Sequence, residues 1–216
     1  MKKILFTDEL TCDVLAGIKT ETRRVMKPVS ENIDKMKHFS PCREGVNVRK
    51  DGSIFCYFGG RFYTPMYKVG EIVAVAQRYR DLYEWYGNPG NFRTYNEYYD
   101  AQDLFQKYGG MDGNPSWTNK LFVKAEDMPH QIQFTGIRAE LLQDISDESC
   151  IREGIVPVPQ AIGPDILQTT FYTYRGAKRM FYNPQDAFAE LIDRTCGRGT
   201  WRDNPFTFVY QFKLVK

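Results

Sequence analysis

The sequence predicts a mixed α+β fold of mostly antiparallel strands with a few helices. Aromatic residues make up 15% of the 216 residues and hydrophobic residues 42%, which is typical of a globular, strand-rich protein. Several segments alternate apolar and polar residues with the period of two of a strand, whereas others place apolar residues at helical spacing after a capping residue. A chain of this length can bury a sizeable core without a metal or disulfide staple.

The first elements are a short strand and a helix. Residues 2–7 are predicted to form the strand, and Thr7 or Asp8 can cap the helix that follows. The apolar residues at helical spacing are Leu10, Val14, Leu15 and Ile18. Gly17 is placed to end this helix, because glycine readily adopts the left-handed conformation found at helix C-termini.

The middle of the chain predicts a hairpin and further strands. An Asp-Gly pair favours a tight turn at 50–53, followed by a strand at 54–58. Residues 71–77 are predicted to form a strand buried on both faces, because their apolar residues run on without alternation. Residues 131–134 and 137–142 are predicted to form a pair of strands.

Two helices and a strand are predicted towards the C-terminus. Ser146 can cap a short helix that Gly154 ends. Asn183 and Pro184 open the last helix, with proline at its favoured first position. Residues 206–215 then alternate as a closing strand. The apolar face expected of this strand is Phe208, Tyr210, Phe212 and Leu214.

Two long stretches, 83–119 and 156–182, interrupt this pattern and are predicted to be insertions. The first is rich in Gly, Asn, Pro and Tyr, with one helix expected around 98–108, and the second is expected to be irregular. Loops of this length are usually functional, interfacial or mobile. Their aromatic rings and cations would suit base stacking, although ordinary core or interface packing explains the rings equally well.

Charge and motif content exclude several classes of protein. The 29 Lys and Arg against 27 Asp and Glu give a net charge of only +2, too little for a protein that coats nucleic acid. No apolar run approaches the roughly 20 residues of a membrane-spanning helix. The start of the chain begins like an export signal, but Asp8 and Glu9 interrupt its apolar stretch. We therefore expect a cytoplasmic protein with no membrane partner. The common nucleotide-cofactor and hydrolase motifs are missing from the sequence, which predicts no cofactor.

The five cysteines favour reduced, structural thiols. Their odd number, their wide spacing and the lack of a C-x-x-C motif argue against a disulfide framework. A zinc site built from His38, Cys42 and Cys56 would lack a recognisable fourth ligand. The sequence therefore predicts no metal site.

The densest polar cluster of the sequence lies between residues 17 and 24. Its cations and hydroxyls are Lys19, Thr20, Thr22, Arg23 and Arg24. Arginine offers paired donors to phosphate, lysine a point charge and threonine a hydroxyl, so the segment predicts contact with an anion or a nucleotide. The alternative is a solvated turn, because cations are also favoured at the C-terminus of a helix.

The segment LAGIKTETRRVMKP resembles the signature of the ASCH family (activating-signal-cointegrator homology), which belongs to the PUA-like superfamily. The residues that fit its Gly-x-Lys-Thr-x-Thr-x-Arg pattern are Gly17, Lys19, Thr20, Thr22 and Arg24. Segments 69–72, 141–155 and 204–212 resemble further family motifs in the same order. One departure is Ala76-Gln77, because many relatives carry Arg-Glu there, and this difference weakens the transfer of a detailed mechanism.

The resemblance implies one domain over residues 1–216, a mostly antiparallel PUA-like β-barrel with helices at its rim and the two insertions. Such folds commonly bind RNA or a nucleotide in a cleft. Here the segment Lys19–Arg24 would line that cleft, and we expect Arg175 and Lys178 of the second insertion to contact the ligand as well.

Two other functions stay open. One branch of the family resembles an amidohydrolase that deacetylates N4-acetylcytidine and another is ribonuclease-like, and the implied active groups are Lys19, Thr22 and Glu153. Lys19 would activate Thr22 while Glu153 passes a proton to the leaving amine. Because Lys19 and Thr22 would point to opposite faces of a regular strand, this mechanism requires a bend. The third alternative is a phage-derived module that binds another protein through the insertions.

Overall fold

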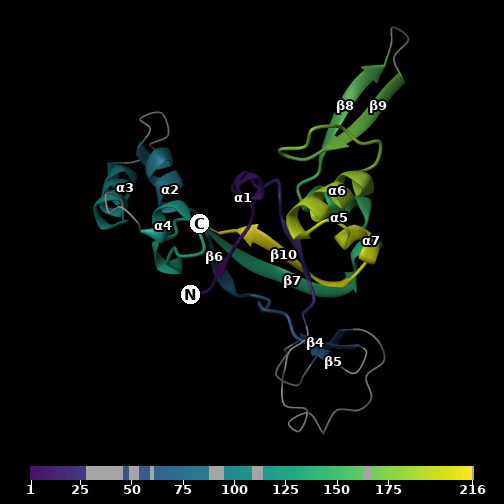
Figure 1. Ribbon diagram of the computed structural model, residues 1–216, viewed down its shortest axis with the longest axis horizontal. Coiled ribbons are helices and arrows are strands. Elements are labelled where there is room, and N and C mark those ends of the chain that lie inside the picture. The colour runs from purple at the N-terminus through teal and green to yellow at the C-terminus, as the bar shows by residue number, and fades with distance from the viewer. Residues whose placement is uncertain are drawn as a thin grey trace. The chain divides into compact units, whose positions relative to one another are not determined.

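The computed structural model describes residues 1–27, 46–48, 54–58, 61–87, 95–108, 114–162 and 167–215 (Figure 1). Its contacts group into two compact units. Unit 1 comprises Met1–Thr11, Ile72–Ile132 and Leu214–Lys216, and unit 2 comprises Cys12–Glu71 and Gln133–Lys213. The expected organisation as one domain stays a prediction.

The strands of the described residues form a mixed five-stranded sheet, a three-stranded sheet and a two-stranded sheet. The order in the largest is β1 (Lys3–Ile4), β6 (Ile72–Val75), β7 (Gln131–Leu141), β10 (Phe206–Leu214) and β2 (Glu21–Val25). The second contains β3 (Val46–Val48), β4 (Ile54–Phe58) and β5 (Arg61–Tyr63), and the third β8 (Val156–Ile162) and β9 (Leu167–Thr173). The β1–β6 pair is parallel, whereas β2–β10, β3–β4, β4–β5 and β8–β9 are antiparallel. The chain therefore has a mixed α/β fold, and the barrel stays a prediction.

The helices that begin at Asp8, Asp147 and Pro184 start and end close to their predicted capping residues. The described helices are α1 (Asp8–Leu15), α2 (Tyr79–Gly87), α3 (Tyr95–Tyr108), α4 (Pro115–Thr118), α5 (Asp147–Arg152), α6 (Pro184–Cys196) and α7 (Thr200–Asp203), with 3₁₀ turns at Ala125–Asp127 and Leu142–Asp144. Ser146 caps α5 by accepting a hydrogen bond from the amide of Ser149, and Asn183 caps α6. Gly17 and Gly154 have positive φ angles of 71° and 105°, as expected of residues that end α1 and α5. Among the described residues, no helix combines the length and the apolar character needed to cross a bilayer.

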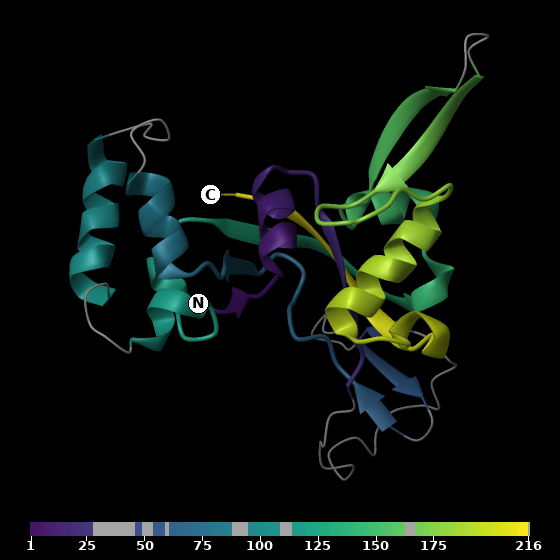
Figure 2. The ribbon, with the colours of Figure 1, turned by 45° about the horizontal axis from the view of Figure 1, so that its top comes forward.

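Unit 1 is more helical than the composition of 83–119 predicts. Figures 1 and 2 both show α2 and α3 side by side. The rings of Tyr79 and Tyr108 stack with centroids 4.1 Å apart, and both hydroxyls donate to Oδ2 of Asp127 at 2.6 Å. The many turn-forming residues of 83–119 predict only one helix there. The packing stabilises more helical structure than that, because tertiary contacts override local propensity.

Two other predictions are corrected by the strands. Residues 131–134 and 137–142 belong largely to one continuous strand, β7, because Gly136 continues the strand instead of forming a turn. Residues 156–182, expected to be irregular, contain the β8–β9 hairpin. Pro157 and Pro159 are compatible with β8 because it is an edge strand, where an outward-facing nitrogen needs no hydrogen-bond partner. The predicted turn at 50–53 lies outside the described residues, whereas the strand at 54–58 is confirmed as β4.

The core of unit 2 includes an aromatic group on one face of β10. Tyr67 stacks on Phe134 with centroids 4.6 Å apart and meets Tyr210 edge-on at 5.5 Å. Phe208, Tyr210 and Phe212 are buried as the alternation predicts, but Leu214 at the strand end is 40% exposed. Val209 is also fully buried, because the opposite face of β10 is covered too. Side chains on both faces of β10 are therefore buried.

Candidate functional site

The signature segment leads from the end of α1 into β2, an edge strand of the five-stranded sheet. The backbone amides of Ile18 and Lys19 donate to the carbonyl of Asp13 at 2.9 and 3.0 Å. The amide of Thr20 then donates to the carbonyl of Arg152 at 2.8 Å. These bonds fix the backbone just before β2 against α1 on one side and the end of α5 on the other.

The regular alternation of β2 divides the signature side chains between two faces of the sheet. Glu21 and Arg23 share one face with Lys19, whereas Thr22 and Arg24 lie on the other. On the second face, Thr22 is paired with Tyr210 of the aromatic group. The bend that would bring Thr22 to the side of Lys19 is not found, because β2 runs unbroken through Thr22.

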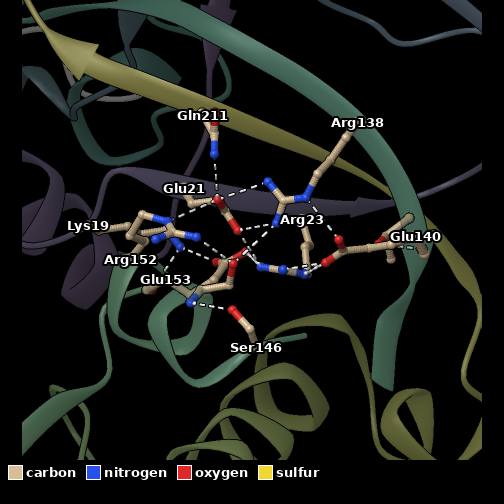
Figure 3. Close-up of polar contacts among 11 residues, drawn as sticks. Lys19, Glu21, Arg23, Arg138, Glu140, Ser146, Arg152, Glu153 and Gln211 are labelled. Atoms are coloured by element: carbon tan, nitrogen blue, oxygen red, sulfur yellow. Dashed lines mark hydrogen bonds and ion pairs between the residues drawn. The ribbon is translucent and has the colours of Figure 1, made fainter. Parts of the chain in front are cut away.

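A group of charged side chains occupies the first face, and Figure 3 shows them converging from β2, β7 and the end of α5. We call it the charge cluster and define it as Lys19, Glu21, Arg23, Arg138, Glu140, Arg152 and Glu153. Four cations face three carboxylates, so the formal charge of the cluster is +1. The sequence-predicted pair of Lys19 and Glu153 is therefore part of a larger network.

The inner half of the charge cluster is almost completely buried. The Lys19 side chain, 1% exposed, donates through Nζ to the backbone oxygen of Glu153 at 2.8 Å and forms an ion pair with the carboxylate of the same residue. Nη1 of Arg23 donates to Glu21 and to Glu153, at 3.0 Å in both cases, and Arg23 also pairs with Glu140. Burial lowers the pKa of Lys19, and the charge of Glu153 opposes this effect.

The outer half of the charge cluster reaches solvent through two arginines. The side chains of Arg138 and Arg152 are 35% and 41% exposed. Arg138 donates to both carboxylate oxygens of Glu21, at 3.1 and 2.9 Å, and Nε of Arg152 donates to the same carboxylate at 3.2 Å. Both guanidinium groups also donate to Oγ of Ser149, at 3.2 and 2.8 Å. Glu21 and Ser149 thus hold the two positively charged guanidinium groups side by side.

Glu21 is the anion at the centre of this arrangement. Burial alone would raise its pKa, but the hydrogen bonds from Arg138 and the charges of Arg23 and Arg138 lower the pKa to about 2. The carboxylate is therefore ionised at neutral pH. It can orient the guanidinium groups of Arg138 and Arg152 permanently.

The remaining predicted residues are not members of the charge cluster. Arg24 is exposed on the other face of β2, Arg175 donates to Asp13 at 2.8 Å, and Lys178 is exposed after β9. Gln77, the departure from the ASCH pattern noted in the sequence, accepts a hydrogen bond at 2.6 Å from the Nδ1 of His130. Of the predicted catalytic trio, only Lys19 and Glu153 are in contact.

The sequence reasoning missed four members of the cluster: Glu21, Arg138, Glu140 and Arg152. A signal was present, because Ile137-Arg138-Ala139-Glu140-Leu141 alternates and places both charged side chains on one face of a strand. Lys19, Glu21 and Arg23 likewise share the parity of one strand face. Each of these two alternating segments carries both cationic and anionic side chains on one face, a pattern that favours pairing between strands of a sheet.

The described residues contain no group of three or more His, Cys, Asp and Glu side chains arranged to hold a metal ion. Of the zinc ligands considered above, His38 and Cys42 lie outside the described residues. Cys56 is buried, and burial raises its pKa to about 11, so this thiol is protonated at neutral pH.

The membership of the ASCH family rests on the sequence motifs, and it stays a prediction. The fold of the described residues is compatible with several families, since a mixed sheet with helices on its faces is a common architecture. Function must therefore be argued from the charge cluster itself. Comparison with protein-family models, with curated proteins and with solved structures finds no match to this chain.

Proposed function

We propose that this chain is an ASCH-type, PUA-like protein that binds RNA or a modified nucleotide at the charge cluster, with Arg138 and Arg152 as the phosphate contacts. The observation that carries the proposal is the convergence of two partly exposed guanidinium groups on Glu21 and Ser149. Guanidinium groups held in a fixed orientation suit the oxygens of a phosphate, because each offers a planar fork of donors.

The distribution of charge supports a ligand role for the outer half of the cluster. Glu153 pairs with the buried Lys19 and Arg23, and the buried Glu21 lies beneath Arg138 and Arg152, so these two arginines are the cations of the cluster that reach solvent. Arg152 uses Nε and Nη2 for Glu21 and Ser149, and its Nη1 can donate to an anion. With a net charge of +2 for the whole chain, a nucleotide or a short single strand fits better than a long duplex.

A salt series with a short single-stranded RNA tests this proposal by fluorescence anisotropy. Each lost phosphate contact reduces the slope of log K against log salt by about 0.7. We therefore expect the variant with both Arg138→Ala and Arg152→Ala to lose about 1.4 from the slope and to bind roughly 10- to 100-fold more weakly.

Arg80→Ala is the matched control, because Arg80 is 44% exposed and paired with Glu84 on α2. This variant should retain the wild-type slope and affinity. Variants are compared only if their thermal unfolding shows a folded chain. A wild-type slope near zero, or an unchanged slope in the double variant, would contradict phosphate binding at this edge.

The second candidate function is hydrolysis of N4-acetylcytidine or RNA by Lys19 and Glu153. The observation that favours it is their buried contact, because burial lowers the pKa of Lys19 towards the range of a general base. The position of Thr22 on the other face of β2 weighs against its proposed role as the nucleophile. A water molecule would be the nucleophile instead: Lys19 first passes its proton to the Glu153 carboxylate, the neutral amine then takes a proton from the water, and Glu153 gives its proton to the leaving group.

The turnover of N4-acetylcytidine and of RNA by the wild type, Lys19→Met and Thr22→Val tests the hydrolase function. If the function is hydrolysis, Lys19→Met lowers the turnover by at least about 100-fold, the usual contribution of a general base, whereas Thr22→Val keeps wild-type turnover. Product formation is followed by chromatography. If the wild-type chain converts neither substrate, hydrolysis is rejected and the binding function stands alone.

A further inference from the structure

A second polar pair lies immediately before the signature segment, in the last turn of α1. Asp13 is 2% exposed, and Arg175 donates from Nε to its Oδ1 at 2.8 Å. Oδ2 of Asp13 is the one buried side-chain nitrogen or oxygen among the described residues for which no hydrogen-bond partner is found. Asp13 is therefore a half-satisfied buried carboxylate next to Lys19, whose amide it binds through its own carbonyl.

The placement of Asp13 is unfavourable for a purely structural residue. An ionised carboxylate can accept about four hydrogen bonds, and a buried oxygen without a donor loses the hydration it has in water. A negative charge in the last turn of a helix is also disfavoured by the helix dipole. Buried acceptors are nearly always satisfied in native proteins, so an unsatisfied one calls for an explanation, and a ligand that donates to it is one.

Arg175 supplies donors beside this acceptor. Its side chain is 50% exposed and follows Tyr174 in a turn closed by the bond from the Ala177 amide to the Tyr174 carbonyl at 2.9 Å. The contact with Asp13 uses Nε, so the two terminal nitrogens of the guanidinium group can donate elsewhere. An acceptor and a fork of donors therefore lie side by side, which is the complement of a nucleoside with both donor and acceptor groups.

We propose that Asp13 and Arg175 form a nucleoside-reading site, an inference that rests on the proposed binding of RNA or a nucleotide. Oδ2 of Asp13 accepts a hydrogen bond from a donor of the nucleoside, either an exocyclic amino group of the base or the 2′-hydroxyl of the ribose. Arg175 orients Asp13 and donates to the same ligand. Because Oδ2 is buried in the free chain, a side chain packed over it must move when the ligand enters.

Four oligonucleotides of eight residues distinguish the two donors: oligo(rC), oligo(rU), oligo(dC) and oligo(dU). A base-reading site prefers both cytosine oligomers over both uracil oligomers, because uracil has a carbonyl in place of the amino group. A ribose-reading site prefers both RNA oligomers over both DNA oligomers. We expect one of these preferences at roughly tenfold, as for a hydrogen bond to a charged group.

Asp13→Asn keeps the shape of the side chain and should abolish that preference, and Arg175→Lys should reduce it. Asp8→Asn is the control, because Asp8 is an exposed carboxylate of the same helix that pairs with Lys120 at 2.8 Å, and this variant should keep the preference. Equal wild-type binding of all four oligomers overturns the inference but leaves the proposed function standing. A wild-type preference in the folded Asp13→Asn variant has the same consequence. Should that variant not fold, a wild-type preference in Arg175→Lys takes its place. Failure of the wild-type chain to bind any oligomer rejects both.

Discussion

Replacing Arg23 with alanine is expected to lower the free energy of unfolding by about 3–5 kcal/mol, the usual effect of removing one partner from a buried ion pair. The Arg23 side chain is fully buried and contacts Glu21, Glu140 and Glu153. Without it, these carboxylates remain in a buried region with fewer cations. Because domains of this size are typically stable by only about 5–15 kcal/mol, the variant should be close to unfolding at 37 °C.

Urea unfolding followed by circular dichroism at pH 7 measures this difference. Arg24→Ala is the matched control, since Arg24 is the next residue of β2 but is exposed on the other face of the sheet. We expect the control to change the free energy of unfolding by less than about 1 kcal/mol, as most exposed substitutions do. Equal losses in the two variants would show that the burial of Arg23 in the charge cluster has no energetic importance.

The local elements of this fold are predictable from short-range chemistry. Ser146 and Asn183 are found as helix caps because their side chains accept hydrogen bonds from the amides three residues later, a pattern readable from the sequence. Gly17 ends α1 for an equally local reason, its positive φ. The buried aromatic face of β10 follows from alternation alone.

The parts that escaped prediction depend on contacts between distant residues. The charge cluster joins Arg23 to Glu140 across 117 positions and to Glu153 across 130, so no local window contains it. The β8–β9 hairpin was not predicted because β8 contains prolines. A proline fits a strand only where its nitrogen faces away from the neighbouring strand, and the sequence does not show which side that is. Resemblance pointed to Lys19 and Glu153 but not to Arg138 and Arg152, which are the residues that reach solvent.

Acid should destabilise the chain through Glu21 in particular. The pKa of Glu21 is lowered from the ordinary 4.5 to about 2 in the folded chain, as burial is outweighed by the hydrogen bonds and charges of Arg138 and Arg23. A group whose pKa is lower in the folded state stabilises the fold above its unfolded pKa and loses that contribution as the pH falls through the folded value. The size of the shift corresponds to about 3 kcal/mol, lost between about pH 5 and pH 2.

Urea unfolding between pH 7 and pH 2 for the wild type and Glu21→Gln isolates this contribution. The variant should be less stable at pH 7, because its neutral amide cannot balance Arg23, Arg138 and Arg152, and its stability should fall by about 3 kcal/mol less on acidification. Glu148→Gln is the control, because Glu148 is a fully exposed glutamate on α5 whose pKa is also lowered, by hydrogen bonds at the helix N-terminus. This variant should also lose less stability in acid than the wild type, but by much less than Glu21→Gln, because the Glu148 side chain is exposed to solvent. If Glu21→Gln retains the full wild-type loss of stability in acid, the carboxylate of Glu21 is not the anion that holds the two solvent-facing arginines, and their role as oriented phosphate contacts loses its physical basis.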